Sequence, residues 1–158
     1  MYRVGIGYDI HRFEAGRPLY LGGVEIPYVK GLLGHSDADV LLHAVCDALL
    51  GAAGLADIGE QFPDTDPTYH GIRSDALLTR VMVLVKNAGF TVENLDTIVI
   101  CEEPKLGPFK KQIRQRIAAL LGIEAERVSV KAKTNERLGE VGAKEAIACH
   151  AAVSIRKG

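Results

Sequence analysis

The residues with the clearest chemical potential are Asp9, His11 and His43. Residues 2 to 10 alternate large apolar side chains with polar or small ones, a pattern that predicts a β-strand. Residues two apart on a strand point to the same face, so the carboxylate of Asp9 and the imidazole of His11 project side by side, roughly 7 Å apart at the backbone. Two such groups can bind one metal ion. A surface Asp and His at the end of a strand are the alternative.

The segment 35 to 47 favours a functional site. Ser36, followed three residues later by Asp39, fits a capping box and predicts a helix that begins at about residue 37. Asp39, His43 and Asp47 then lie four residues apart and share one face of that helix. Exposed helix faces usually carry Lys, Glu and Arg. A stripe of carboxylates and imidazole on an otherwise apolar helix therefore indicates a site.

One carboxylate and two imidazoles are a plausible ligand set for Zn²⁺. Three protein ligands leave the fourth position for substrate, which is typical of a catalytic zinc site. We therefore predict Asp9, His11 and His43 as metal ligands. From spacing alone, an arrangement without a metal stays open.

A second candidate site lies at the end of a predicted strand, residues 128 to 133. Lys131, Lys133 and Thr134 offer ammonium and hydroxyl donors that suit phosphate oxygens, and Glu136 offers a hard oxygen for Mg²⁺. Ligands of α/β sheets commonly bind at such strand ends. A charged strand end in water is the alternative.

Several other polar residues have weaker signals. His35 and Ser36 precede a predicted helix N-terminus, whose free amides favour an anion, although a plain helix cap is the alternative. Asp47 and Asp57 are candidate acceptors for sugar hydroxyls or simply solvated carboxylates. The basic stretch 105 to 116 has no interleaved aromatic side chains, so a solvated helix face is favoured over nucleic-acid binding.

Composition predicts one domain over residues 1–158. With 158 residues and 47% hydrophobic content, the chain can build one sizeable core but not two. A net charge of -1 gives no argument for nucleic acid or an anionic membrane, and no apolar run approaches a membrane span. Cys46, Cys101 and Cys149 are odd in number and widely spaced, which predicts reduced, buried thiols. We expect a cytoplasmic protein without a leader segment.

The predicted elements suggest an α/β fold of the α+β type. We expect a mixed β-sheet with helices packed on one face. Both alternating sets of the last strand, residues 147 to 156, are mostly small and apolar. Because a monomer would not expose such a face, we expect the open face to be buried in an oligomer. The remaining predicted elements are a hairpin at 19–21 and 24–26, helices at 37–53, 74–88 and 108–121, and strands at 96–102 and 128–133.

Taken in order, the motifs resemble the 2-C-methyl-D-erythritol 2,4-cyclodiphosphate synthase family from residue 1 to about residue 156. The motifs that carry the resemblance are Asp9-x-His11, His35-Ser36-Asp37-Ala38-Asp39-x3-His43, Asp57-Ile58-Gly59, Phe62-Pro63-Asp64-Thr65-Asp66, Pro104-Lys105 and Lys131-Ala132-Lys133-Thr134-Asn135-Glu136. The resemblance implies conversion of 4-diphosphocytidyl-2-C-methyl-D-erythritol 2-phosphate into the 2,4-cyclodiphosphate and CMP, in the non-mevalonate route to isoprenoids.

The resemblance also implies residue roles. It places Zn²⁺, or another divalent cation such as Mn²⁺, on Asp9, His11 and His43, and Mg²⁺ between the substrate phosphates on Glu136. It makes His35, Lys133, Thr134 and Glu136 catalytic. It implies a homotrimer with sites at subunit interfaces. The substrate-binding residues that it implies are Ser36 at a phosphate, Asp57 and Gly59 at the ribose, Asp64 at the methylerythritol unit, Cys101, Pro104, Lys105 and Leu106 around the cytosine, and Asp47 and Ala132.

One run departs from the family pattern. The family often carries Gly-Arg-Gly-Glu where this chain has Gly142-Ala143-Lys144-Glu145, and the family Arg lines a cavity on the trimer axis. Lys144 offers a positive charge but not the fork of an Arg. The resemblance therefore does not extend to an isoprenoid diphosphate in that cavity. Two rival functions stay open, a zinc phosphohydrolase and a nucleotide sensor with structural zinc.

Overall fold

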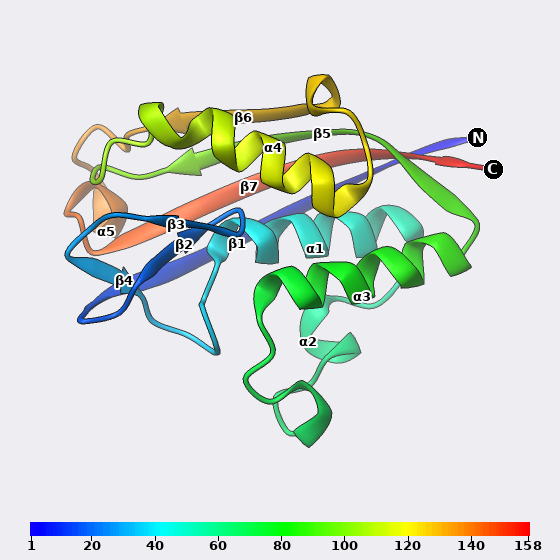
Figure 1. The fold of residues 1–158 in the computed structure, drawn as a ribbon, viewed down its shortest axis with the longest axis horizontal. Helices are drawn as coiled ribbons and strands as arrows, with labels where there is room; N and C mark the ends of the chain where they lie inside the picture. Colours follow the sequence, from blue (N-terminus) through cyan, green and yellow to red (C-terminus); the bar gives the residue numbers. More distant parts are fainter.

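A five-stranded mixed sheet forms one layer of the molecule, in the strand order β4-β1-β7-β5-β6 (Figure 1). The computed structural model describes residues 1–158. Strands β5 and β6 pair in parallel and the other neighbours pair antiparallel, which confirms the predicted mixed sheet. The strands are β1 (Tyr2–Ala15), β4 (Lys30–Leu32), β5 (Phe90–Ile100), β6 (Val128–Lys133) and β7 (Ala146–Lys157). The predicted hairpin forms a separate sheet of β2 (Leu19–Leu21) and β3 (Val24–Ile26).

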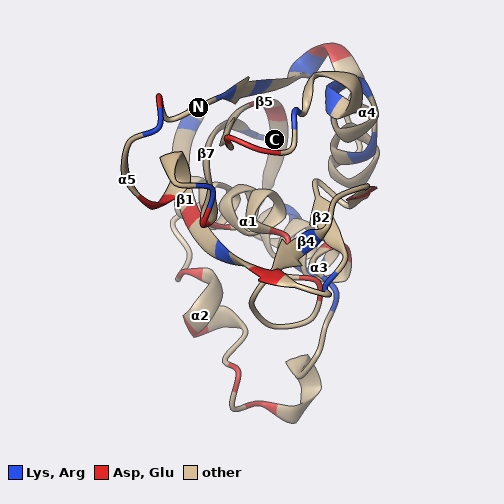
Figure 2. Cartoon of the chain, turned by 90° about the vertical axis from the view of Figure 1, so that its left-hand side faces the viewer, with Lys and Arg blue, Asp and Glu red and all other residues tan.

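Helices cover one face of the sheet, as predicted. Figure 2 shows α1, α3 and α4 on the same side of the curved sheet. None of the helices combines the length and the apolar composition that crossing a lipid bilayer requires. The helices are α1 (Val40–Ala53), α2 (Ile58–Gln61), α3 (Ser74–Asn87), α4 (Lys110–Leu121) and α5 (Gly139–Gly142), with 3₁₀ turns at Pro67–Tyr69, Gly107–Phe109 and Ala125–Arg127.

Helix α1 packs directly on the backbone of β1, because glycines of β1 face it. A Cβ atom added at Gly7 would lie 1.9 Å from the carbonyl oxygen of Ala44, and one at Gly5 would meet the same helix comparably closely. Such distances are far below van der Waals contact, so any side chain there would push the helix away from the strand. Alternation along β1 places Asp9 and His11 on this same face. The contact therefore fixes α1 relative to both residues.

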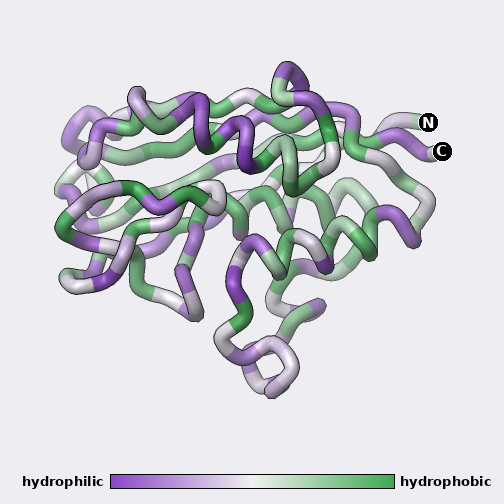
Figure 3. The backbone as a smooth tube through the Cα atoms, in the orientation of Figure 1, coloured by the Kyte–Doolittle hydropathy of each residue, from purple (hydrophilic) through white to green (hydrophobic).

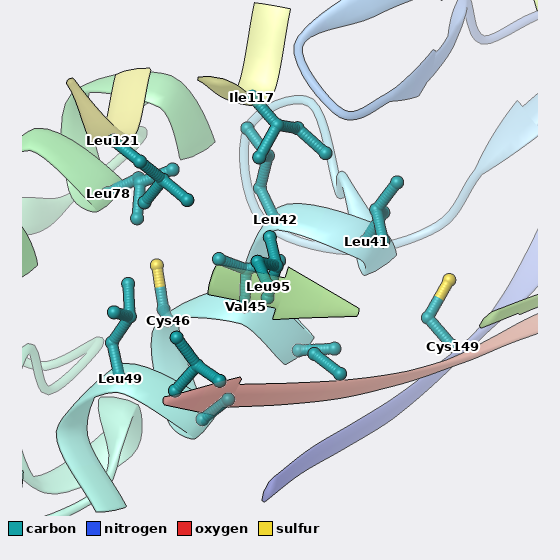
Figure 4. Close-up of a cluster of buried hydrophobic side chains, with 14 of the residues drawn as sticks. Leu41, Leu42, Val45, Cys46, Leu49, Leu78, Leu95, Ile117, Leu121 and Cys149 are labelled. Carbon is teal, nitrogen blue, oxygen red and sulfur yellow. The ribbon is translucent and has the colours of Figure 1, made fainter. Parts of the chain in front are cut away.

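The main hydrophobic core surrounds α1. Of the 14 residues of this helix, 11 are buried, so it is a central helix rather than a surface one. Figure 4 shows its side chains meeting Leu78 of α3, Ile117 and Leu121 of α4, and Leu95 of β5. In Figure 3, α1 is correspondingly green, whereas purple, hydrophilic stretches follow α4 and the loops. A polar side chain on α1 is therefore unusual, because most of this helix is surrounded by apolar residues.

The opposite face of the sheet carries only the short helix α5, whose Val141 packs on Ala146 and Ala148 at one end of β7. The large exposed apolar side chains of this face come from β1 and are 42 to 80% exposed. We predicted a bare, apolar face from the last strand; most of this face is bare, but the exposed outward residues of β7 are small or polar, such as Ala152 and His150, and Ala148 is buried beside Val141 of α5. Burial of this face in an oligomer stays a prediction. The large exposed apolar residues of β1 are Tyr2, Val4, Ile6, Tyr8 and Ile10.

The predicted capping box with Ser36 is wrong. Asp39 itself caps α1, which begins at Val40 rather than at about residue 37. The fully buried carboxylate of Asp39 also accepts hydrogen bonds from the amides of Gly22, at 3.0 Å, and Gly23, at 2.7 Å. Asp39 thereby ties the start of α1 to the hairpin. Ser36 lies before the helix with a φ of 53°.

The predicted polar face of α1 is consequently correct only in part. Asp39 is directed into the hairpin instead of lining up with His43. The residues of α1 that escape full burial are His43, Asp47 and Gly51. They lie four residues apart, so α1 has one accessible face, and that face carries an imidazole and a carboxylate.

The other predicted elements are present with shifted ends. Helix α1 ends before Gly54, whose φ of 74° is the left-handed conformation that glycine favours. Ser74 is the first residue of α3 and not its cap, and Pro108 lies in a 3₁₀ turn that precedes α4. Strand β5 begins at Phe90 rather than at about residue 96, and β4 was not predicted. These ends depend on packing more than on local sequence.

Candidate active site

Asp9 and His11 of β1 meet His43 of α1, as predicted. Oδ2 of Asp9 lies 2.9 Å from Nε2 of His11 and 3.2 Å from Nδ1 of His43. One ligand atom from each residue lies within 4.8 Å of the others, so a single cation can reach all three. The side chains are 28, 16 and 19% exposed, so the cluster is half-buried but open to solvent on one side. The group is therefore a candidate metal centre.

The charges of this cluster suit a divalent cation. Burial opposes ionisation of Asp9, but hydrogen bonds from His11 and His43 outweigh it and hold the pKa of Asp9 well below its usual range. Burial likewise opposes protonation of His43, yet its bond to Asp9 raises the pKa of the imidazole. A carboxylate that is ionised at neutral pH thus stands between two imidazole nitrogens. This donor set, one oxygen and two nitrogens aimed at one point, fits a metal such as zinc.

A cavity of about 320 Å³ opens beside the cluster. Four other predicted site residues line it together with the Asp9–His11–His43 cluster, namely His35, Asp47, Gly59 and Asp64. The imidazole of His35 and the carboxylate of Asp64 lie 3.0 Å apart and are 71 and 70% exposed. Residues from β1, α1 and two loops are therefore brought together at one opening.

Asp47 holds the loop that forms one wall of this cavity. Its Oδ1 accepts a hydrogen bond from the amide of Ile58 at 2.9 Å, at the start of α2. Burial raises the pKa of Asp47. Asp57 caps α2 by accepting from the amide of Glu60 at 3.0 Å, and it does not line the cavity itself. The predicted ribose contact of Asp57 stays a prediction, and Gly59 of the same turn lines the cavity.

The second predicted group lies where β5 and β6 end. The amide of Cys101 donates to the carbonyl oxygen of Lys133 at 2.8 Å, and Glu102 accepts from the amide of Asn135 at 2.6 Å. These bonds hold the segments after the two strands together. Burial raises the pKa of the Cys101 thiol to about 12, so this thiol is protonated at neutral pH. The group comprises Cys101, Pro104, Lys105, Leu106, Ala132, Lys133, Thr134 and Glu136.

Within a single chain, the Asp9–His11–His43 cluster and the group at the ends of β5 and β6 lie apart. Sheet register places Asp9 opposite Cys149, Cys149 opposite Val99, and Val99 opposite Ala132. The groups therefore lie at the same end of the sheet, but two strands separate β1 from β6. Three strand spacings amount to roughly 14 Å. No residue of the second group lines the 320 Å³ cavity.

Sequence analysis missed several residues of this site. Phe62 and Tyr69, whose rings stack edge to face at 5.1 Å, form an apolar wall of the cavity. Ser74, predicted only as the start of a helix, places its Oγ 3.0 Å from Nε2 of His43. No local pattern signals these contacts, because they join segments that are distant in the sequence.

Comparison with known proteins decides the family. The model of the YgbB family matches residues 2–156. The 2-C-methyl-D-erythritol 2,4-cyclodiphosphate synthase of Syntrophomonas wolfei subsp. wolfei is 57% identical over 155 residues, which are 98% of this chain and 99% of that protein. The chain belongs to the 2-C-methyl-D-erythritol 2,4-cyclodiphosphate synthase family. It is a lyase of isoprenoid biosynthesis that forms the cyclic diphosphate.

Solved structures of the synthase family have the same fold. The bifunctional IspDF of Campylobacter jejuni superimposes with a TM-score of 0.95 at 42% identity, over all of this chain and 43% of that longer one. A 2C-methyl-D-erythritol-2,4-cyclodiphosphate synthase in a form with bound CDP gives a TM-score of 0.91 at 41% identity, over 98% of this chain and 100% of that one. The resemblance found in the sequence is thereby confirmed.

Proposed function

We propose that the Asp9–His11–His43 cluster is the centre at which this chain converts 4-diphosphocytidyl-2-C-methyl-D-erythritol 2-phosphate into 2-C-methyl-D-erythritol 2,4-cyclodiphosphate and CMP. The observation that carries the proposal is the convergence of these three side chains beside a cavity lined by His35, Asp47 and Asp64. A phosphate needs cationic and hydrogen-bonding partners; a metal ion held by the cluster would supply the charge, and the imidazole of His35 offers a hydrogen-bonding partner.

The donor set favours Zn²⁺ on Asp9, His11 and His43, with Mn²⁺ as the alternative, and Glu136 is proposed for Mg²⁺. When bound, the two cations would neutralise charge that gathers on the reacting phosphates. The nucleophile is the substrate's own 2-phosphate, already ionised at neutral pH, and the leaving group is CMP, a stable anion. The protein therefore needs no strong general base.

The work left to the protein is to fold a flexible polyanion so that the attacking oxygen lies in line with the leaving group. Correct alignment of an intramolecular attack can contribute about 7 to 11 kcal/mol. His35 at the cavity mouth and Ser36 just behind it are proposed to orient phosphate oxygens. Asp57 and Gly59 are proposed to contact the ribose and Asp64 the methylerythritol unit, with Asp47 holding the loop that carries Gly59.

The cytidine half of the site is proposed to come from a second copy of the chain. In one chain the residues after β5 and β6 lie three strand spacings from the metal cluster, and none of them lines its cavity. Lys133 and Thr134 are proposed to hold the diphosphate, and the 101–106 segment with Ala132 to enclose the cytosine. A related synthase with bound CDP supports a cytidine ligand of this kind. The exposed apolar residues of β1 support a homotrimer that buries the open sheet face.

The remaining proposals concern the whole chain. One continuous core of 37 residues supports a single domain over residues 1–158. Three buried free thiols support a reducing, cytoplasmic environment.

Product analysis tests the proposal. Purified protein with Zn²⁺ and Mg²⁺ is incubated with the cytidylyl substrate, and phosphorus NMR distinguishes a cyclic product from an opened one. We expect CMP and the cyclic diphosphate in equal amounts. His43→Ala should abolish both while the oligomer stays assembled, and His70→Ala, an exposed imidazole outside the cavity lining, should be neutral. An opened product would indicate a phosphohydrolase, and near-normal turnover of His43→Ala would refute the metal assignment.

A further inference from the structure

A chain of hydrogen bonds leads from His43 into the protein, on the side away from Asp9. Nε2 of His43 lies 3.0 Å from the hydroxyl oxygen of Ser74, and that hydroxyl donates to Oδ1 of Asp37. Ser74 is the first residue of α3 and only 1% exposed. The contacts join residues 31 and 37 positions apart in the sequence, so they exist only in the folded chain.

The donors around Asp37 fix the direction of this chain. The carboxylate of Asp37 accepts from the hydroxyl of Ser74, from the amide of Ser74 at 3.1 Å and from the amide of Asp39 at 3.2 Å. The amide of Ser74 is one of the free N–H groups at the start of a helix, so its partner cannot come from the helix itself. A carboxylate held by three donors accepts and does not donate.

The proton count then settles the tautomer of His43. A serine hydroxyl has one hydrogen, and that of Ser74 is committed to Asp37. The Ser74 oxygen can therefore only accept from His43, which requires the hydrogen of the neutral ring to be on Nε2. In the metal-free chain Nδ1 also carries a hydrogen, which it donates to the ionised carboxylate of Asp9 at 3.2 Å; a cation bound at Nδ1 would replace that hydrogen and leave the neutral ring with its hydrogen on Nε2.

We infer that Ser74 and Asp37 are positioning residues that hold His43 in the Nε2–H tautomer and direct its Nδ1 at the cation. The inference rests on the proposed function, since it assigns these two residues to the metal site of that function. His11 has no such support, because its Nδ1 is buried without a partner. The two imidazoles thus differ: the ring nitrogen of His43 that faces away from Asp9 contacts Ser74, whereas that of His11 has no polar partner.

Metal affinity and the tautomer are the quantities to measure. Ser74→Ala removes the acceptor but keeps the backbone amide bond to Asp37, so α3 can still begin at the same place. Asp37→Asn can donate to Ser74, which frees the serine hydroxyl to point at His43 and disfavours the required tautomer. We expect both variants to bind Zn²⁺ about 10 to 100-fold more weakly in competition with a chromogenic chelator. Thr79→Ala, which removes an exposed hydroxyl from the same helix, is the matched control and should bind zinc like the wild type.

Nitrogen-15 NMR of the imidazole gives a readout that a merely structural role would not move. In the zinc-loaded wild type, His43 should carry its hydrogen on Nε2, protected from exchange, and Ser74→Ala should lose that protection. Zinc affinity within twofold of wild type in both variants, or zinc bound through Nε2, would overturn the inference. CMP release separates the two proposals. A wild type that binds zinc without releasing CMP refutes the proposed function alone, whereas normal release with unchanged zinc affinity in Ser74→Ala refutes only the positioning role.

Discussion

Asp9, His11 and His43 lie on a strand and a helix that touch directly, whereas Lys133, Thr134 and Glu136 lie on exposed chain at the end of β6 and beyond it. The first group is braced by the glycine contact between β1 and α1. The second is held by a few hydrogen bonds between the segments that follow two strands. A ligand cluster that must fit one ion benefits from rigid support. A surface that meets a second copy of the chain can acquire its final order on assembly.

The largest expected effect comes from breaking the rigid region at Gly7. Gly7→Ala places a methyl group 1.9 Å from the carbonyl oxygen of Ala44, so α1 must move off β1. We expect a loss of about 3 kcal/mol of unfolding free energy, measured with urea, together with loss of zinc binding. Gly51→Ala is the matched control on the same helix, because a Cβ there meets no atom within 4 Å. It should stabilise the protein by about 0.5 to 1 kcal/mol.

Zinc should stabilise the protein through the Asp9–His11–His43 cluster, and this gain should not depend on Lys133. At a free concentration of 100 times its dissociation constant, zinc should add about 2.7 kcal/mol to the unfolding free energy. His11→Ala should remove this gain, and Lys133→Ala should keep it. Equal gains in the two variants, measured by urea unfolding with and without a chelator, would show that zinc binds elsewhere.

A smaller effect on activity is expected from substitution of Lys133, in the exposed group at the end of β6. Lys133→Ala would remove the proposed charge-assisted hydrogen bond to the substrate diphosphate, so KM for the cytidylyl substrate should rise about tenfold or more. Zinc affinity should stay unchanged, since Lys133 lies across the sheet from the metal cluster. Lys111→Ala, on the solvated face of α4, should alter neither quantity. A zinc affinity that falls with Lys133→Ala would contradict the division of the site into two halves.

The smallest expected effect is the pH dependence of the unfolding free energy that the metal-free Asp9–His43 pair contributes. The lowered pKa of Asp9 contributes stability that is present above its unfolded value of about 4 and lost as the pH falls further. The raised pKa of His43 contributes stability that is present below its unfolded value of about 6.5 and lost as the pH rises through the folded value. The pair should therefore stabilise the metal-free protein most between about pH 4 and 6.5. In urea unfolding with chelator present, the advantage of wild type over His43→Gln should shrink from pH 5.5 to pH 8.5. An advantage that stays constant would refute the ion pair.

Part of the site follows from local sequence. Alternation along residues 2 to 10 places Asp9 and His11 on one face of a strand, because strand geometry allows nothing else. The four-residue spacing of His43 and Asp47 likewise places them on one face of a helix. The prediction failed at Asp39, which has the same spacing but sits at the helix start. There its carboxylate meets the amides of Gly22 and Gly23, which no helix pattern reveals.

The sequence by itself determined that one strand presents a carboxylate beside an imidazole, and that a nearby apolar helix carries a second imidazole, because backbone geometry sets the direction of each side chain. Only the tertiary structure decided that the two elements meet. Their contact depends on glycines that let β1 and α1 approach, and on partners such as Ser74 that lie 31 residues from His43. The strand order that separates β1 from β6 is also a tertiary property, since no local sequence pattern predicts which distant strands pair.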